Sequence, residues 1–241
     1  MRTIGTVCPV WQEHRYLPLV LEQMQLCDGP KLVIWQDKPL YWFGQGDPPS
    51  GHQSRVRDVL AQFPKIEVMK IDRAPFGEEG GFMNLSKIGA THVATQGADL
   101  VFWYDSDWLY SLNDTLQLYR DVHAGSKPRW ATRARHYWRD FYHTMDDRDL
   151  YVVFSVDGVV HEPGLESELQ RTEYIGYHAA YVLTDEEMYL KINSWGHAPL
   201  FKERQFFEKE WLAHDDSLVK PEPSQPPPDD VLVRLKEWGA W

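Results

Sequence analysis

The chain has 241 residues, a hydrophobic share of 43% and a formal net charge of −11. These values suit one domain with a full core, and the acidic charge argues against a broad electrostatic grip on nucleic acid, although a local basic patch can persist in an acidic total. Two cysteines, Cys8 and Cys27, exclude a disulfide framework and lack the spacing of metal ligands. No stretch approaches the roughly 18 apolar residues of a membrane span, and the N-terminus runs directly into a strand-like segment, so we expect a cytoplasmic protein.

The first half of the chain alternates β-rich runs with amphipathic stretches. Apolar, β-rich runs predict strands at 3–10, 31–35, 66–71 and 100–104. Helical periodicity predicts helices near 14–26, 52–63 and 82–96. Strands that are apolar throughout and alternate with helices indicate an α/β fold with a largely parallel central sheet covered on both faces. Ligands of such sheets bind beyond the carboxyl ends of the strands, so one site can collect the segments 9–13, 36–37 and 105–107.

The second half is less regular. Its patterns predict a helix near 111–124, a strand near 129–134, a strand pair around 150–161 with a turn at 156–158, a strand at 173–183, and helices near 184–193, with Thr184 as N-cap, and 200–213. A proline-rich segment from Pro221 breaks regular structure, and a last amphipathic helix is predicted near 229–238. We therefore divide the chain into a domain at 1–220 and a proline-rich strap with a C-terminal helix at 221–241.

The fourth predicted strand ends in Asp105-Ser106-Asp107. Two carboxylates at positions i and i+2, where the backbone turns, can face one hard cation, and oxygen-rich coordination suits Mg²⁺ or Mn²⁺. Such a cation would neutralise a diphosphate leaving group. Acidic pairs with this spacing also occur in solvated turns, so the motif gains its meaning from its context.

That context is a resemblance to the family 2-like GT-A glycosyltransferases. Four segments carry it in the family's order: CPVWQE at 8–13, VIWQD at 33–37, GFMNLSKIGA at 81–90 and ADLVFWYDSD at 98–107. Together they cover about residues 4–110. The resemblance implies a GT-A fold in which 1–110 binds nucleotide and metal and 111–220 supplies the acceptor site. Trp108 departs from the family, which often has a third acidic residue there.

The resemblance also assigns roles to individual residues. It implies nucleotide contacts for Pro9, Val10, Glu13, Asp37, Asn84, Lys87 and Asp105. It implies metal ligation by Asp105 and Asp107, with His214 as a third ligand for which His161, His178 and His197 compete. It places Tyr174, Gly176 and Trp211 near the donor or acceptor sugar, where Gly176 would allow a close approach of backbone and ligand.

Inverting transfer requires a carboxylate that takes the proton from the acceptor hydroxyl. The segment WLAHDDSL at 211–218 resembles the acidic motif that follows an aromatic-rich helix in the family. The resemblance therefore implies Asp215 as the catalytic base and Asp216 as the second candidate. The alternative is that both residues only end a helix, a position where aspartate is common.

One basic, aromatic-interleaved patch interrupts the acidic chain. It comprises Arg133, Arg135, His136, Trp138 and Arg139. Such a patch could hold phosphates of a donor or of an anionic acceptor, including nucleic acid. It could equally offset the charge of the aspartates that follow it in the sequence. Both interpretations stay open.

The function predicted from these observations is transfer of a sugar from a nucleotide diphosphate, with a UDP-sugar as the expected donor, to an acceptor hydroxyl, with Mn²⁺ or Mg²⁺ as cofactor. The acceptor stays open among a glycan, a lipid-linked sugar, a protein and a modified DNA base. Two alternatives are a nucleotidyltransferase-like enzyme and a noncatalytic carbohydrate- or partner-binding protein. The glycine- and lysine-rich signature of the first is not seen near the N-terminus, and the intact Asp105 and Asp107 argue against the second.

Overall fold

The structure is a computed structural model that describes residues 2–11, 14–36, 44–46, 51–71, 81–155, 169–194, 198, 202–203, 205–213 and 225–241. Within these ranges only the backbone is described at 51–52, 81–84, 86, 146–151 and 153–155. The strands are β1 Ile4–Val10, β2 Lys31–Gln36, β3 Glu67–Ile71, β4 Leu100–Trp103, β5 Trp108–Leu109, β6 Arg129–Trp138, β7 Thr144–Ser155 and β8 Leu169–Tyr181. The helices are α1 Leu17–Gln25, α2 Gly51–Leu60, α3 Gly81–Thr95, α4 Leu112–Ala124, α5 Asp185–Ser194, the short π-helix η3 Phe207–Trp211 and α7 Asp229–Glu237.

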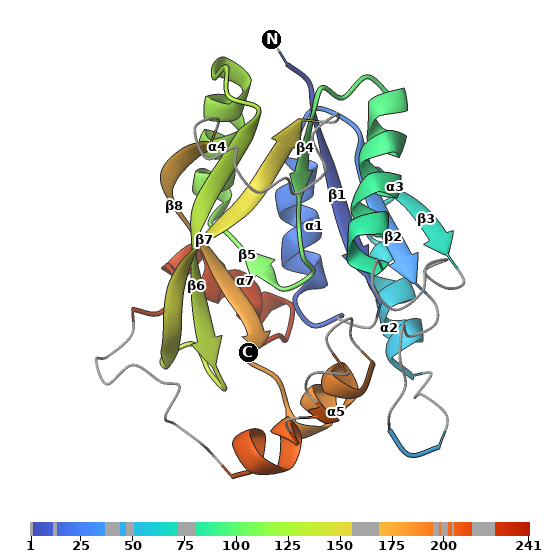
Figure 1. Ribbon diagram of the computed structural model, residues 1–241, viewed down its shortest axis with the longest axis vertical. Helices are drawn as coiled ribbons and strands as arrows, with labels where there is room; N and C mark the ends of the chain where they lie inside the picture. The colour runs from blue at the N-terminus through green and yellow to red at the C-terminus, as the bar shows by residue number, and fades with distance from the viewer. Residues whose placement is uncertain are drawn as a thin grey trace.

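The described strands form one sheet in the order β3-β2-β1-β4-β7-β6-β8-β5 (Figure 1). The four adjacent strands β3, β2, β1 and β4 run parallel to one another. Beyond β4 the sheet becomes mixed, because β7 is antiparallel to both β4 and β6, whereas β8 is parallel to β6. This arrangement confirms the predicted α/β fold with a mostly parallel central sheet flanked by helices.

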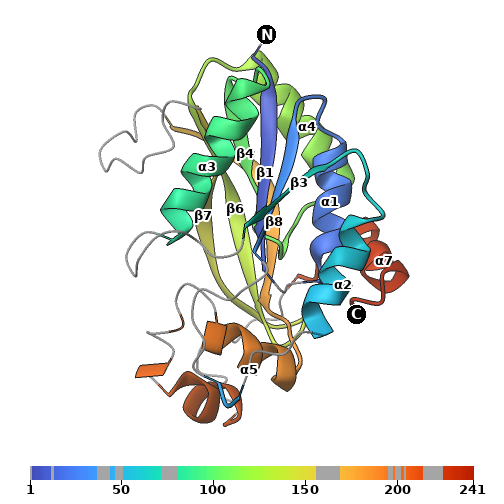
Figure 2. The same cartoon turned by 90° about the vertical axis from the view of Figure 1, so that its right-hand side faces the viewer.

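Helices cover both faces of the parallel half of the sheet. Figure 2 shows α3 on one side of the sheet and α1, α2 and α7 on the other. This two-sided cover explains why β1 and β4 are apolar at almost every position, since Val7, Leu100 and Phe102 are each at most 1% exposed. Because β1, β2 and β4 run in the same direction, their carboxyl ends share one edge of the sheet.

The hairpin that joins β6 and β7 was not predicted. The predicted strand at 129–134 extends to Trp138, and the chain turns at 139–143 to pair β7 with β6. The side chain of Asp140 makes this turn, because its Oδ1 accepts the backbone N–H groups of Tyr142 at 2.7 Å and His143 at 3.0 Å. The turn predicted at 156–158 lies outside the described residues.

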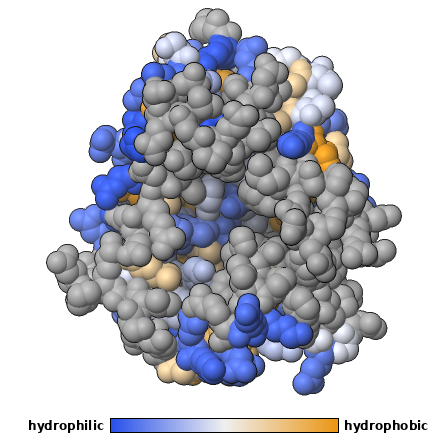
Figure 3. Space-filling model, viewed as in Figure 1, coloured by the Kyte–Doolittle hydropathy of each residue, from blue (hydrophilic) through white to orange (hydrophobic). Residues whose placement is uncertain are grey.

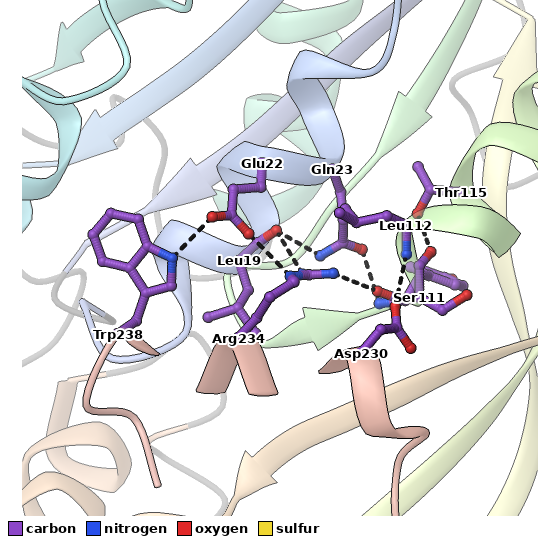
Figure 4. Close-up of polar contacts among 10 residues, drawn as sticks. Leu19, Glu22, Gln23, Ser111, Leu112, Thr115, Asp230, Arg234 and Trp238 are labelled. Atoms are coloured by element: carbon purple, nitrogen blue, oxygen red, sulfur yellow. Dashed lines mark hydrogen bonds and ion pairs between the residues drawn. The ribbon is translucent and has the colours of Figure 1, made fainter. Parts of the chain in front are cut away.

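The C-terminal helix α7, which the sequence predicted, packs against α1. Figure 4 shows its buried Arg234 directed at Glu22, with Nε 3.0 Å from a carboxylate oxygen. Trp238 donates its indole N–H to the other oxygen of Glu22 at 2.9 Å. Asp230 accepts the backbone N–H of Leu112 at 3.2 Å, so α7 also contacts the start of α4. The division of the chain at residue 220 stays a prediction.

Within the described residues, no helix has both the length and the apolar character needed to cross a bilayer. Among the described residues on the face drawn in Figure 3, hydrophilic side chains gather along one flank and at the lower end, and apolar side chains form small patches.

Candidate active site

The Asp-Ser-Asp segment lies directly beyond the end of β4. The backbone N–H of Tyr104 still bonds to Val7 of β1 at 2.9 Å, and the N–H of Trp108 then bonds back to the carbonyl of Asp105 at 3.2 Å, which closes a turn. The carbonyl of Asp107 accepts the N–H of Ala179 at 3.0 Å. The motif is thus clamped between the parallel half of the sheet and β8, at the edge where ligands of open α/β sheets bind.

Asp107 is buried and paired with two side chains. It is 6% exposed, and its Oδ2 lies 2.7 Å from Nζ of Lys191 on α5. Its Oδ1 lies 3.4 Å from Nε2 of His178 on β8. Burial by itself would raise the pKa of Asp107, but the neighbouring Lys191 and His178 outweigh burial and hold that pKa well below its usual range. Asp107 is therefore a carboxylate at neutral pH.

Asp105 has the opposite electrostatic environment. Burial, reinforced by the negative charge of Asp107, raises the pKa of Asp105 to about 6. The indole N–H of Trp103 donates to its Oδ1 at 3.2 Å and opposes the shift in part. Two carboxyl groups separated by one residue therefore differ in charge around pH 6, a separation of pKa values that is common at functional sites.

A pair of histidines extends the site along the sheet. Nδ1 of His178 lies 2.6 Å from Nδ1 of His136 on the neighbouring strand β6, and the two rings are nearly perpendicular. The indole ring of Trp108 contacts His178 edge-on, with centroids 5.8 Å apart. His178 was one of the rivals to His214 as a third metal ligand, and the structure places it beside Asp107.

Lys191 is the site residue that sequence reasoning missed. It is 5% exposed although lysine is almost never fully buried unless it is paired. The signal was present in the spacing, because Lys191 falls three residues after Met188 and one before Ile192, on the apolar side of the predicted helix. A lysine among core positions indicates a buried anionic partner, but the sequence does not say which.

The structure describes only some of the other residues that were predicted to contact the nucleotide. Pro9 and Val10 form the end of β1, and Lys87 is exposed on α3. The remaining predicted residues of the nucleotide, metal and catalytic groups lie outside the described residues or have no described side chain: Glu13, Asp37, Asn84, His214, Asp215 and Asp216. Their roles stay predictions.

The three residues predicted near the sugar have other partners in this structure. The hydroxyl of Tyr174 donates to Asp121 on α4 at 2.7 Å. A Cβ at Gly176 would lie 2.9 Å from the hydroxyl of Tyr110, so the glycine is explained by that close approach. Trp211 is 1% exposed and donates its indole N–H to Asp185 at 2.8 Å. Sugar contacts by these residues stay predictions.

The described residues include two carboxylates that could take part in a cation site. Among them, no three His, Cys, Asp or Glu side chains form a group that could hold a metal ion. Mg²⁺ is commonly held in enzymes by one or two carboxylates together with substrate phosphates and water. Asp105 and Asp107 could supply such carboxylate oxygens to a cation whose coordination is completed by a diphosphate, and the oxygens of Asp107 also contact Lys191 and His178.

Comparison with known proteins yields similarities in structure only. No family model matches the chain, and neither does any curated protein. Glucosyl-3-phosphoglycerate synthase from Mycobacterium tuberculosis, in complex with Mn²⁺, UDP and phosphoglyceric acid, is similar with 18% identity and a TM-score of 0.36, over 56% of this chain and 43% of the synthase. The chain thus spans less than half the length of that synthase.

Two further solved structures are similar over more of the chain. TarS from S. aureus has 9% identity and a TM-score of 0.42, over 78% of this chain and 62% of that chain. A 4-diphosphocytidyl-2C-methyl-D-erythritol synthase has 11% identity and a TM-score of 0.44, over 79% and 97%. These values are low and carry no argument by themselves. The strand order and pairing show an α/β fold with a mostly parallel central sheet.

Proposed function

We propose that the chain transfers a sugar from a nucleotide diphosphate, with UDP as the expected nucleotide, to an acceptor hydroxyl with the help of Mn²⁺ or Mg²⁺. The observation that carries the proposal is the pair Asp105 and Asp107 at the carboxyl end of β4, where one carboxylate is held ionised and buried by Lys191 and His178. A bound cation would supply neutralisation of the departing diphosphate.

Each residue of the pair has its own role in this proposal. Asp107 would hold the cation, and Lys191 keeps that carboxylate charged and oriented by a contact of 2.7 Å. Asp105 would contact the cation or the donor ribose. A cation or another positive charge beside Asp105 would lower its raised pKa, since opposite charges favour the ionised form. Donor binding and ionisation of Asp105 are then expected to be coupled.

The other assignments are proposed from the family resemblance. Asp37 would hold the nucleoside, His214 would complete the cation site, and Asp215, or Asp216 in its place, would take the proton from the acceptor hydroxyl in an inverting reaction. A cytoplasmic location belongs to the same proposal. The acceptor stays open among a glycan, a lipid-linked sugar, a protein and a modified DNA base.

Binding of UDP with and without Mn²⁺ tests the proposal directly. We expect UDP to raise the melting temperature only when Mn²⁺ is present, because a ligand of the native state stabilises by mass action. Asp105→Asn should remove most of this effect. Asp58→Asn is the matched control, since Asp58 is exposed on α2 and loses the same charge. Binding of UDP that needs no divalent ion would favour the noncatalytic alternative.

Turnover separates the two enzymatic alternatives. A glycosyltransferase releases UDP from a labelled UDP-sugar and moves the label to a compound in an acceptor pool. A nucleotidyltransferase instead releases pyrophosphate from a nucleoside triphosphate in the presence of a sugar phosphate or a similar alcohol phosphate. Pyrophosphate release without sugar transfer would overturn the proposed reaction.

A further inference from the structure

The turn after β6 holds an arginine in an unusual backbone conformation. Arg139 directly follows β6 and has a φ of 65°, which is uncommon for residues other than glycine. Its backbone N–H donates to the carbonyl of Tyr181 at 2.9 Å, which fixes the turn against the end of β8. Left-handed non-glycine residues cost conformational energy and are concentrated at functional sites.

Aromatic rings hold the guanidinium of Arg139. Its Cζ lies 4.3 Å from the ring centroid of Trp211 and 5.9 Å from that of Trp138. Both rings are 1% exposed, and their centroids are 5.3 Å apart. Cation–π contacts stabilise the charge through the ring faces, but they do not satisfy the N–H donors of the guanidinium.

Two of these donors are buried and make no hydrogen bond in the part of the chain that the structure describes. They are Nε and Nη2 of Arg139, and the indole Nε1 of the adjacent Trp138 is in the same condition. Asp140 is the next residue, but its carboxylate is engaged with the backbone N–H groups of Tyr142 and His143 and with the His143 ring. Buried donors are almost always satisfied and buried charges almost always paired, so this arrangement suits an anionic partner.

The two unpaired donors lie on one edge of the guanidinium. Their N–H bonds run parallel, in the geometry that pairs with two oxygens of a carboxylate or a phosphate. We propose that this edge of Arg139, backed by the indole rings of Trp138 and Trp211, binds the carboxylate or phosphate group of a small-molecule ligand. Of the basic patch in the sequence, the proposal selects Arg139, because Arg135 donates to Gln225 at 3.3 Å and His136 contacts His178.

Nε and Nη2 are buried in this structure, so the proposed binding requires the side chain to rotate. Arg139 as a whole is only half-buried, and no side-chain hydrogen bond to a described residue restrains its guanidinium. A rotation over the flat indole faces would therefore break no such hydrogen bond.

Helix α5 contacts both the proposed anion subsite and Asp107. Met188 and Ile192 of α5 pack in the same apolar cluster as Trp138 and Trp211, and Lys191 of this helix contacts Asp107. The subsite is thereby placed to hold the charged group of an acceptor. That assignment to the acceptor rests on the proposed function, whereas anion binding by Arg139 does not.

Inorganic phosphate and acetate are the probes that test the subsite. Each is titrated into the full chain at constant ionic strength, with sodium chloride as the balancing salt, and binding is followed by tryptophan fluorescence and by the melting temperature. We expect a saturable response of the wild-type protein. A response to phosphate alone identifies a phosphate subsite, a response to acetate alone a carboxylate subsite, and a response to both the shared chemistry.

Substitutions assign the response to Arg139. Arg139→Gln should abolish it, and Arg139→Lys, which keeps the charge but loses the parallel donors, should weaken binding at least tenfold. Arg133→Gln, at an exposed position on the preceding strand β6 and with the same loss of charge, should respond like the wild type. Arg139→Asn serves as a second variant because asparagine tolerates the left-handed backbone.

The inference is overturned if neither anion gives a response in the wild type, or if Arg139→Gln responds as strongly as the wild type. Binding of UDP with Mn²⁺ in the same assay reports on the proposed function separately. If the wild type does not bind UDP with Mn²⁺, the result counts against the transferase. If it does not respond to either anion, the result counts against the subsite.

Discussion

Lys191, which is buried, and Arg139, which is half-buried, are two cations in neighbouring parts of the molecule, and they differ in their partners. Lys191 lies 2.7 Å from a buried carboxylate. The guanidinium of Arg139 lies over tryptophan rings, and two of its N–H donors have no partner among the described residues. A buried charge that is paired belongs to the framework of the native state, whereas one with unpaired donors is available to a ligand. The predicted stability effects of changing the two residues follow from this difference.

Lys191→Met should have the largest effect. It leaves Asp107 buried without its ammonium partner, and breaking a buried ion pair in this way costs about 3–5 kcal/mol. The free energy of unfolding, measured by urea denaturation at pH 7, should fall by about this amount. Lys87→Met, at an exposed position on α3, is the control and should change stability by less than about 0.5 kcal/mol. A loss below about 1 kcal/mol for Lys191→Met would remove the distinction between the two cations.

Asp105→Asn should have an intermediate effect that depends on pH. The pKa of Asp105 is raised to about 6 in the folded protein from 3.8, so the native state binds a proton more tightly than the unfolded state, and the wild type loses stability as the pH rises between these values. The asparagine variant lacks this loss. Its stability relative to the wild type should therefore rise by about 2–3 kcal/mol between pH 4 and pH 7 and stay constant above that.

Asp107 supplies the internal reference for that experiment. Its pKa is held below the usual range by Lys191 and His178, so its contribution to stability is present above the unfolded pKa of about 4 and is lost as the pH falls below it. The Asp105→Asn variant should keep this loss of stability at acidic pH, because it comes from Asp107. A stability difference between the variant and the wild type that does not change from pH 4 to pH 7 would contradict the assignment of the raised pKa to Asp105.

Arg139→Gln should have the smallest effect in buffer without phosphate or carboxylates. The variant loses a cation–π contact worth about 0.5–2 kcal/mol but also removes the desolvation penalty of a buried, incompletely paired charge. The net change in the free energy of unfolding should stay within about 1 kcal/mol, as measured by the same urea denaturation. A loss as large as that of Lys191→Met would show that Arg139 is part of the framework and not a ligand residue.

The parallel half of the fold was predictable because its signals are local. The strands β1, β2 and β4 are short runs of mostly apolar residues, whereas β3 mixes apolar with charged residues, and the positions of α1, α2 and α3 follow from helical periodicity. The hairpin at 139–143 was not predicted because it contains no glycine or proline. It depends on Asp140 bonding to backbone N–H groups two and three residues ahead, a pattern that many aspartates could form but few do.

The candidate site likewise combines residues that the sequence predicted with residues that only the structure identified. The sequence selected Asp105 and Asp107 by their spacing and by the segments around them, and it noted His178 only as one of several histidines. Lys191 lies 84 residues from Asp107, and His136 lies 42 residues from His178. Gly176 was assigned to a sugar contact, whereas the structure explains it by the close approach of Tyr110.

The sequence by itself determined the alternation of strands and helices and the place of the acidic pair at the end of the fourth strand, since hydrophobic periodicity and chain direction are local properties. Only the tertiary structure decided that Asp107 is held ionised, that the pKa of Asp105 is raised, and that the edge of Arg139 is left without a partner among the described residues. These properties depend on burial and on charges brought together from distant parts of the chain, and both arise only when the elements pack.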